Sequence, residues 1–369
     1  MLIKNARVFL NGRFVHADVR FSDRIEEIGD LAGEGLNAEG LYLLPGLVDV
    51  HTHGAMGADT CDAVENGLKN MAKFYASRGV TSFCATSMTY DEETLLDVMR
   101  TAGSFLGGGD MAKCVGINME GPFISPKRKG AQDAKNIFPP DFAMFERLNA
   151  AANGRIRLVD VAPETEGATA FIKKASEVCA VSLAHTAADY DTALQAFFSG
   201  ASHVTHLFNA MEPFLHRSPG VVGAAFDAGA YVELICDGIH LHPAMIRASF
   251  ALFGAQRVCL VSDSMRSAGL PDGEYELGGQ PVVVKAGKAT LPDGTIAGSS
   301  TNVLTALQNC VAFGIPKEQA LTAATLTPAR AIGLAREIGS IERGKLADIL
   351  LTDEAFNLNK VFIEGRELV

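Results

Sequence analysis

Residues 47–54 read LVDVHTHG, an apolar run that ends on two histidines and a glycine. Its apolar and β-branched residues predict a buried strand. Alternate side chains of a strand share a face, so His51 and His53 point the same way. Two imidazoles on one face can bind a single metal ion, and a hydrogen-bonded pair of histidines explains the spacing equally well. The rest of the chain must decide between these interpretations.

Seven further runs of this kind follow in order: VTSFCATS, CVGINME, IRLVDVAPE, AVSLAHT, ASHVTHLF, YVELICDG and RVCLVSDS. Helix-like segments lie between most of them, for example at 62–78, 91–104, 141–152, 165–178, 189–199 and 243–253. Apolar strands alternating with helices are typical of a parallel sheet covered on both faces. Eight such units predict an α/β fold of the closed (β/α)8 TIM-barrel type. An open doubly wound sheet is the alternative, but no G-x-G-x-x-G follows the first strand.

The two ends of the chain differ from its middle. Residues 1–45 and 336–369 consist of short β-like runs broken by turn signals such as Asn11-Gly12. We expect these ends to pair into one small β-sandwich domain beside a barrel at 46–335. Residues 270–297 contain several turn signals and short β runs, and they predict an inserted β-hairpin followed by a helix near 300–313.

The composition describes a globular protein that is 48% hydrophobic, with a net charge of -11. This charge argues against general affinity for nucleic acid or an anionic membrane. The seven cysteines are scattered without a C-x-x-C pair, which favours free thiols in a reducing compartment. No run approaches the ~18 apolar residues of a membrane span. We therefore expect a cytoplasmic protein with neither a membrane nor a nucleic-acid partner.

The predicted strands end on residue types that bind metals. In a barrel the carboxyl ends of the strands converge on one face, where active sites lie. Each residue alone has an ordinary explanation as a helix cap or a hydrogen-bonded polar group, but six of them at five strand ends favour a metal site for zinc, iron or a similar ion. The six residues are His51, His53, Glu120, His185, His206 and Asp263.

His203 lies three residues before His206, so on a strand it faces the other way. We assign it to packing.

Several motifs resemble one family in order: LPGLVDVHTHG, MEGPFISPKRKGA, LAHT, THLFNAM, CDGIH, VSDSM and AGSS. They are similar to those of the N-acetylglucosamine-6-phosphate deacetylases of the amidohydrolase superfamily. The first motif marks only the superfamily, whereas MEGPFIS together with THLFNAM and DGIH is more specific. The correspondence covers most of the chain, including GSIERGKLADILL near its end.

The resemblance implies a metal-dependent enzyme with one or two divalent ions per subunit, zinc or iron first and manganese, cobalt or nickel as further options. Glu120, His185 and His206 match the main metal ligands of the family. His51 and His53 match a second metal position, which some members lack, and Glu120 would then bridge the two ions. Asp263 matches the catalytic aspartate and lies beside the metal ligands.

The resemblance also implies a homodimer and a substrate, a phosphorylated N-acetyl amino sugar whose acetamido group is hydrolysed in amino-sugar catabolism or cell-wall sugar recycling. Asn209, the backbone N–H of Ala210, Arg217 and His240 match positions that contact the sugar phosphate, some of them across the dimer interface. Gln132 stands where many members have a histidine near the acetamido group. Its amide can donate a hydrogen bond but carries no charge.

Three alternatives remain open from the sequence. The sugar epimer N-acetylgalactosamine 6-phosphate would share nearly all of these motifs. A more distant amidohydrolase would share the first one. A barrel that serves as a non-catalytic scaffold would be expected to lose metal ligands, and this chain keeps them all.

Overall fold

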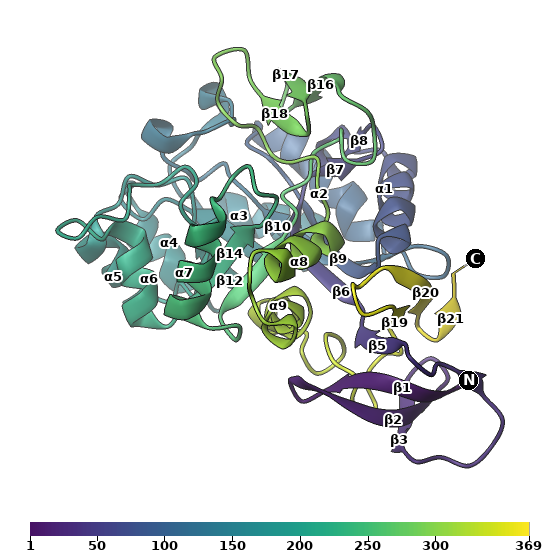
Figure 1. Cartoon of the computed structure of the whole chain (residues 1–369). Helices are drawn as coiled ribbons and strands as arrows, with labels where there is room; N and C mark the ends of the chain where they lie inside the picture. The colour runs from purple at the N-terminus through teal and green to yellow at the C-terminus, as the bar shows by residue number, and fades with distance from the viewer. Residues whose placement is uncertain (369) are drawn as a thin grey trace.

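The computed structural model describes residues 1–368, and its centre is a barrel of parallel strands surrounded by helices (Figure 1). Within the described residues the barrel sheet has eight strands, each paired in parallel with the next along the chain. The predicted (β/α)8 barrel is therefore confirmed. The strands are β6 (Leu47–Thr52), β9 (Val80–Thr86), β10 (Lys113–Met119), β11 (Ile156–Val161), β12 (Ala180–Leu183), β13 (His203–Val204), β14 (Tyr231–Ile235) and β15 (Val258–Val261).

The barrel closes between its first and last strands, β6 and β15. The Asp263 N–H donates to the carbonyl of His51 at 2.9 Å, and the His53 N–H donates to the carbonyl of Ser264 at 2.8 Å. A parallel bridge between Thr52 and Ser264 lies at the same level. Closure thus brings residues from opposite ends of the barrel sequence into contact where the strands end.

Helices follow the strands around the barrel, as the alternating pattern predicted. The sequence did not predict α6, whose glycines at 220 and 223 lower its helix propensity, nor did it predict α9 and α10. The helices are α1 (Glu65–Ser77), α2 (Glu92–Ser104), α3 (Phe142–Ala151), α4 (Ala168–Ala175), α5 (Tyr190–Phe198), α6 (Gly220–Ala228), α7 (Pro243–Phe253), α8 (Val303–Ala312), α9 (Lys317–Ala324) and α10 (Leu326–Ala331).

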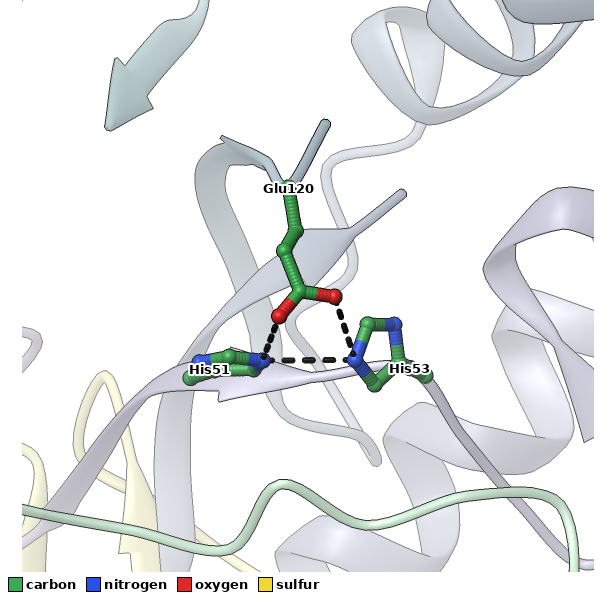
Figure 2. A group of neighbouring side chains, drawn as sticks. All are labelled: His51, His53 and Glu120. Atoms are coloured by element: carbon green, nitrogen blue, oxygen red, sulfur yellow. Dashed lines mark hydrogen bonds and ion pairs between the residues drawn. The ribbon is translucent and has the colours of Figure 1, made fainter. Parts of the chain in front are cut away.

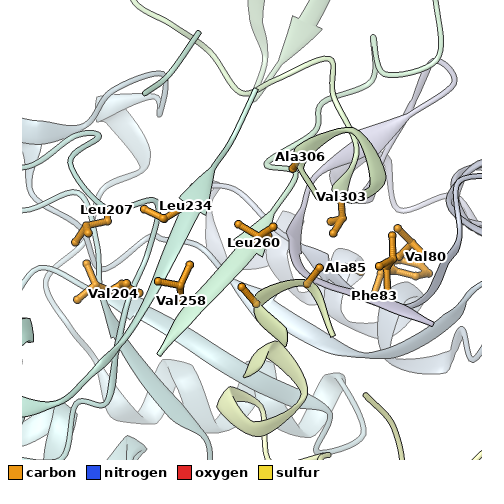
Figure 3. Close-up of a cluster of buried hydrophobic side chains, with 14 of the residues drawn as sticks. Val80, Phe83, Ala85, Val204, Leu207, Leu234, Val258, Leu260, Val303 and Ala306 are labelled. Atoms are coloured by element: carbon orange, nitrogen blue, oxygen red, sulfur yellow. The ribbon is translucent and has the colours of Figure 1, made fainter. Parts of the chain in front are cut away.

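The main hydrophobic core lies between the barrel strands and the surrounding helices, and Figure 3 shows part of it. Leu234 of β14 and Leu260 of β15 are fully buried there, near Val303 and Ala306 of α8. Alternate strand residues belong to this core, and the residues between them, such as Val48 and Val261, are buried in a further cluster. Burial of both faces explains why the strands read as nearly continuous apolar runs. The core fixes the strand positions and hence the places where the strand ends project.

The small β domain joins the two ends of the chain, as expected. Its strands are β1 (Leu2–Leu10), β2 (Arg13–Phe21), β3 (Ile25–Gly29), β4 (Leu36–Asn37), β5 (Tyr42–Pro45), β19 (Ile349–Thr352), β20 (Leu358–Ile363) and β21 (Arg366–Glu367). They form one connected sheet in the order β21-β20-β19-β5-β1-β2-β3, with β4 paired to β1. Phe21 on β2 and Phe362 on β20 are far apart in this order, yet their ring centroids lie 5.5 Å apart. The sheet therefore curves around a core of its own.

The segment near 270–297 forms an antiparallel sheet with strands β16 (Gly273–Leu277), β17 (Gln280–Lys285) and β18 (Lys288–Thr290). It extends the expected hairpin by one short strand. Leu277, Val282 and Val284 pack in a small separate core with Met265 and Ala131, which lie near the strand ends of the barrel. The inserted sheet is therefore attached to the face of the barrel where the predicted site residues lie.

Shorter elements complete the described chain. A two-stranded sheet, β7 (Gly54–Ala55) and β8 (Ala58–Asp59), follows the two histidines directly. The 3-10 turns are η1 (Thr60–Asp62), η2 (Pro126–Arg128) and η3 (Ala134–Asn136).

Candidate active site

The six predicted strand-end residues meet at the carboxyl end of the barrel. All six are buried, with exposed fractions of 7% or less. His185, His206 and Asp263 each lie two residues past their strands in left-handed backbone, with φ of 43°, 30° and 48°. Such φ values are uncommon outside glycine and mark strained positions that often belong to functional sites. From these positions His185 and His206 contact Glu120, and Asp263 contacts His53.

One group of ligand atoms lies around Glu120 Oε1. His185 Nε2 is 3.2 Å from this oxygen, and His206 Nε2 is 3.1 Å from it. The two imidazole nitrogens lie 3.1 Å from each other. The His185 ring is held by its other nitrogen, Nδ1, which lies 2.9 Å from the Arg128 carbonyl. Three ligand atoms from three different strand ends thus face one point.

A second group combines the Glu120 carboxylate with His51 and His53, as Figure 2 shows. His51 Nε2 and His53 Nε2 are 3.2 Å apart. Glu120 Oε2 lies 3.3 Å from His53 Nε2, and Oε1 lies 3.6 Å from His51 Nε2. The carboxylate therefore contacts both histidine pairs: Oε1 faces His185 and His206 and also lies near His51, and Oε2 faces His53.

The spacing of these atoms fits a divalent metal ion. In a tetrahedral site with metal–nitrogen bonds of ~2.0–2.1 Å, neighbouring ligand atoms lie about 3.3 Å apart. The distances around Glu120 are 3.1–3.3 Å for the closest contacts. Two neutral imidazoles whose Nε2 lone pairs face each other have no favourable interaction, whereas a cation between them satisfies both. The five residues form a cluster able to bind metal.

Asp263 lies beside the second group. Its Oδ1 is 3.4 Å from His53 Nε2 and 3.5 Å from His51 Nε2. Burial raises the pKa of Asp263, but the nearby imidazoles His51 and His53 outweigh this effect and hold the pKa below its usual value. Asp263 is therefore ionised at neutral pH and can accept a proton.

The residues enclose a cavity of about 390 Å³. Of the residues expected to bind substrate, Gln132, Asn209, Ala210 and His240 line it together with five of the strand-end residues. In the described chain Arg217 is outside this lining; its guanidinium is exposed and bonds to the neighbouring His216 ring at 2.6 Å. The inserted sheet and the loop after it also contribute lining residues: Leu277, Thr295, Ile296 and Gly298.

A family model described as "Amidohydrolase family" matches residues 42–368, which is most of the chain. The chain belongs to the amidohydrolase family. Its barrel, its strand-end histidines and its shared carboxylate are thus the features of a metal-dependent hydrolase fold.

Curated relatives of this amidohydrolase are sugar-phosphate deacetylases. The N-acetylglucosamine-6-phosphate deacetylase of Bacillus subtilis is 38% identical over 84% of this chain and 80% of the relative. The N-acetylgalactosamine-6-phosphate deacetylase of Escherichia coli O157:H7 is 34% identical over 88% of this chain and 87% of the relative. A mutant of the N-acetyl-D-glucosamine-6-phosphate deacetylase of Mycobacterium smegmatis, solved with N-acetyl-D-glucosamine-6-phosphate, aligns with a TM-score of 0.93 at 31% identity and covers 100% of this chain and 99% of its own.

Sequence reasoning missed one carboxylate of the amidohydrolase centre, Glu233 of β14. Its Oε2 lies 2.8 Å from His51 Nδ1 and accepts the His206 N–H at 3.0 Å. Burial raises the pKa of Glu233, but the His51 and His203 imidazoles outweigh it and hold the pKa well below its usual range. An ionised partner on Nδ1 fixes the His51 ring with Nε2 toward Glu120. A lone acidic residue within the apolar run YVELI was the available signal.

His203 belongs to the same network. Its Nε2 lies 3.1 Å from Glu233 Oε1, and the ring is fully buried. The assignment of His203 to packing is therefore incomplete, because the side chain also bonds to the carboxylate that orients His51.

His240 lies at the cavity with its ring fixed from one side. Its Nδ1 is 2.7 Å from Asp237 Oδ2, and Asp237 Oδ1 accepts the N–H groups of Ile239 and His240 at 2.8 and 2.9 Å. The carboxylate therefore holds the loop and leaves His240 Nε2 free of this contact. Asp237 is a second supporting residue that the sequence did not predict.

Within residues 1–368, no helix is both long and apolar enough to span a membrane.

Proposed function

We propose that this chain hydrolyses the acetamido group of N-acetylglucosamine 6-phosphate to glucosamine 6-phosphate and acetate. The observation that carries the proposal is the Glu120 carboxylate between two histidine pairs, with the ionised Asp263 beside it in the cavity. The deacetylase names of relatives at 38% and 34% identity support the substrate class.

The amide is difficult to hydrolyse because its carbonyl is weakly electrophilic and an amine anion is a poor leaving group. A divalent ion held by Glu120, His185 and His206 would lower the pKa of a bound water and polarise the carbonyl. Asp263 Oδ1 takes one proton from the attacking water and later delivers it to the departing nitrogen, so a neutral amine leaves. The second water proton stays on the new carboxylic acid, which releases it to solvent as acetate departs.

The phosphate would be bound away from the metal centre. Asn209, Ala210 and His240 line the cavity, and their N–H groups are candidate donors to an anion. We propose that Arg217 of a second copy supplies the remaining cation, because Arg217 is exposed and lies outside the cavity of its own chain. Its planar group of donors suits a phosphate. The active form would then be a homodimer.

We propose zinc or iron as the metal, with one or two ions per subunit, because imidazole and carboxylate ligands in this geometry suit both. A cytoplasmic location is consistent with the seven cysteines, which all lie in the described part of the chain and are unpaired.

The test combines elemental analysis of the purified protein with acetate release from three sugars. N-acetylglucosamine 6-phosphate should be the best substrate, and unphosphorylated N-acetylglucosamine should lose both kcat and apparent affinity, because binding energy at the phosphate orients the amide. Equal efficiency on the sugar and its phosphate would overturn the phosphate assignment. Higher kcat/KM on N-acetylgalactosamine 6-phosphate would support the alternative named by the Escherichia coli relative.

A further inference from the structure

Gln132 lies in the loop between β10 and α3, and both ends of its side-chain amide are engaged. The residue is 2% exposed. Its Oε1 accepts the backbone N–H of Thr89 at 2.9 Å, and its Nε2 donates to Glu120 Oε2 at 2.6 Å. The side chain therefore bonds to the centre of the metal cluster instead of pointing freely into the cavity.

These two bonds fix the orientation of the amide. A backbone N–H can only donate, so the Gln132 oxygen must face Thr89 and the NH2 group must face Glu120. The second bond joins an amide to an ionised carboxylate and is stronger than a bond between neutral groups. Burial raises the pKa of Glu120, but hydrogen bonds from His185 and His206 outweigh it and hold the pKa well below its usual value.

The bond from Gln132 reaches the carboxylate oxygen on the His53 side. Glu120 Oε2 faces His53 Nε2 at 3.3 Å, whereas Oε1 faces the His185 and His206 pair. The terminal torsion of a glutamate is broad, so nothing intrinsic to the side chain keeps its two oxygens in these positions. Gln132 supplies a fixed donor on Oε2 and thereby limits the rotation.

The loop that carries Gln132 is held from both sides. The Gln132 N–H donates to the Lys129 carbonyl at 2.9 Å, and the side chain of Gln280 on β17 donates to the Ala131 carbonyl. Ala131 also packs with Leu277 of the inserted sheet. The donor is therefore in place before any ion arrives, which lowers the cost of ordering the site.

We propose that Gln132 is a positioning residue, which holds Glu120 Oε2 toward His53 and so completes a second divalent-cation site with His51 and His53. The inference deepens the proposed function and rests on its metal centre. It replaces the contact with the acetamido group that the resemblance implied for Gln132. The inserted sheet then acts on the second cation site indirectly. Gln280 bonds to the Ala131 carbonyl and holds the loop, and the next residue of that loop, Gln132, bonds to Glu120.

The test is a titration of metal-free wild type and metal-free Gln132→Met with Zn²⁺. Calorimetry measures the affinity of each ion, and elemental analysis counts the ions bound per chain. Methionine keeps the length of the side chain and removes both hydrogen bonds made by the Gln132 amide. Loss of an outer hydrogen-bond partner weakens metal binding by about 10–100-fold, so the second Zn²⁺ should bind that much more weakly while the first keeps its affinity. Unchanged affinity for both ions would overturn the proposal, as would a lower kcat with both ions still bound at wild-type affinity.

Three further variants keep the test decisive. Gln132→Asn retains an amide that is too short to reach Glu120, and it should show the same loss if Gln132→Met fails to fold. Lys135→Ala changes an exposed residue near the same loop that pairs only with Asp133 in the described structure, and it should keep both ions. In a His51→Gln/His53→Asn background, Gln132→Met should leave the single remaining Zn²⁺ unaffected; a further loss there would contradict the assignment. None of these titrations needs substrate. A wild type without deacetylase activity would reject the proposed function, but the metal affinities would still test the role of Gln132.

Discussion

At the scale of single residues, the centre depends on side chains held in uncommon backbone conformations. His185, His206 and Asp263 all adopt left-handed φ directly after their strands. Each such residue costs of order 1–3 kcal/mol, and the closed barrel around it must supply that energy. In these conformations His185 and His206 lie within hydrogen-bond distance of Glu120. Asp263 lies 3.4 Å from the Nε2 atom of His53.

Asp263→Asn should lower kcat by at least ~10²-fold, the low end for general acid–base catalysis, because the amide keeps the size of the side chain but cannot accept and return the proton. The fold should be retained, since the Asp263 N–H bond to His51 comes from the backbone. Steady-state acetate release, with circular dichroism as the check on folding, measures both. A folded variant with near-wild-type turnover would rule out the role.

The two histidine pairs should respond differently to substitution. His51→Gln/His53→Asn should remove one metal ion per chain and lower activity without abolishing it, because Glu120, His185 and His206 still provide three ligands and an open position. His206→Ala should nearly abolish turnover. Metals per chain are counted by elemental analysis after loading with excess zinc or iron. A double variant that binds as much metal as the wild type would exclude His51 and His53 as ligands.

At the scale of an element, strand β1 contains an irregularity that one side chain supports. The pairing of β1 with β2 shifts register between Ile3 and Ala6, and Asn5 adopts a φ of 62°. Asp18 on β2 accepts the N–H of Asn5 at 2.9 Å and the N–H of Leu31 at 3.0 Å. These backbone bonds hold the pKa of Asp18 below its usual value. The carboxylate replaces the ladder partner that the bulged residue lacks.

Asp18→Ala should destabilise the protein by about 1–3 kcal/mol at pH 7, because two backbone donors lose their acceptor. The folded pKa of Asp18 lies below the unfolded value of about 3.9, so its contribution is complete above that value and is lost as the pH falls through the folded pKa. The difference in unfolding free energy between variant and wild type, measured in urea at several pH values, should therefore shrink below pH ~4. A difference that is constant down to pH ~2 would contradict this.

At the scale of the whole molecule, one buried ion pair joins the barrel to the small β domain. Lys113 opens β10, and its ammonium lies 2.6 Å from the Asp348 carboxylate just before β19. Asp348 also accepts the Glu364 N–H at 3.0 Å. Burial raises the pKa of Asp348 despite the nearby Lys113, so the pair forms at a desolvation cost. The Lys113 ammonium also lies 3.8 Å from the Glu364 carboxylate, so it contacts two acidic groups of the small domain.

Lys113→Met should destabilise the protein by about 3–5 kcal/mol, since it leaves the Asp348 carboxylate buried without its counter-ion. Lys113→Met/Asp348→Asn should lose less than the sum of the two single variants, because neither charge is then left alone. Thermal melting of the three variants measures the coupling. Additive losses would mean that the pair contributes nothing beyond its separate side chains.

The proposed dimer makes a further prediction at this scale. Arg217→Ala should raise KM for N-acetylglucosamine 6-phosphate by about 10-fold or more, as expected for the loss of a charge-assisted contact, and should leave the weak turnover of the unphosphorylated sugar unchanged. Light scattering of the same preparation gives the oligomeric state. A monomer with wild-type KM in the variant would reject a role for Arg217 across an interface.

The strands and the ligand set were predictable because their signals are local. Each barrel strand is a short apolar run, and each candidate ligand stands at or within two residues of its end, so the pattern from LVDVHTH to RVCLVSDS could be read without knowing the packing. Helix α6 was missed because its two glycines lower the local helix propensity, and burial of its apolar residues stabilises the helix in the folded protein. Glu233 was missed because its partner His51 is 182 residues away in the sequence.

The order of residues along the chain is enough to place certain chemical groups at the carboxyl end of the barrel: imidazoles at 51, 53, 185 and 206 and carboxylates at 120 and 263. How these groups face each other depends on the packed fold. Barrel closure brings Thr52 and Ser264 into contact across 212 positions of sequence, and it places Glu120 against both histidine pairs, with Oε1 toward His206 and Oε2 toward His53. The same packing makes Gln132, which lines the cavity as expected, a donor to Glu120 as well. Local periodicity specifies which side of a strand a residue occupies, but hydrogen-bond partners depend on distances that only the closed, packed barrel defines.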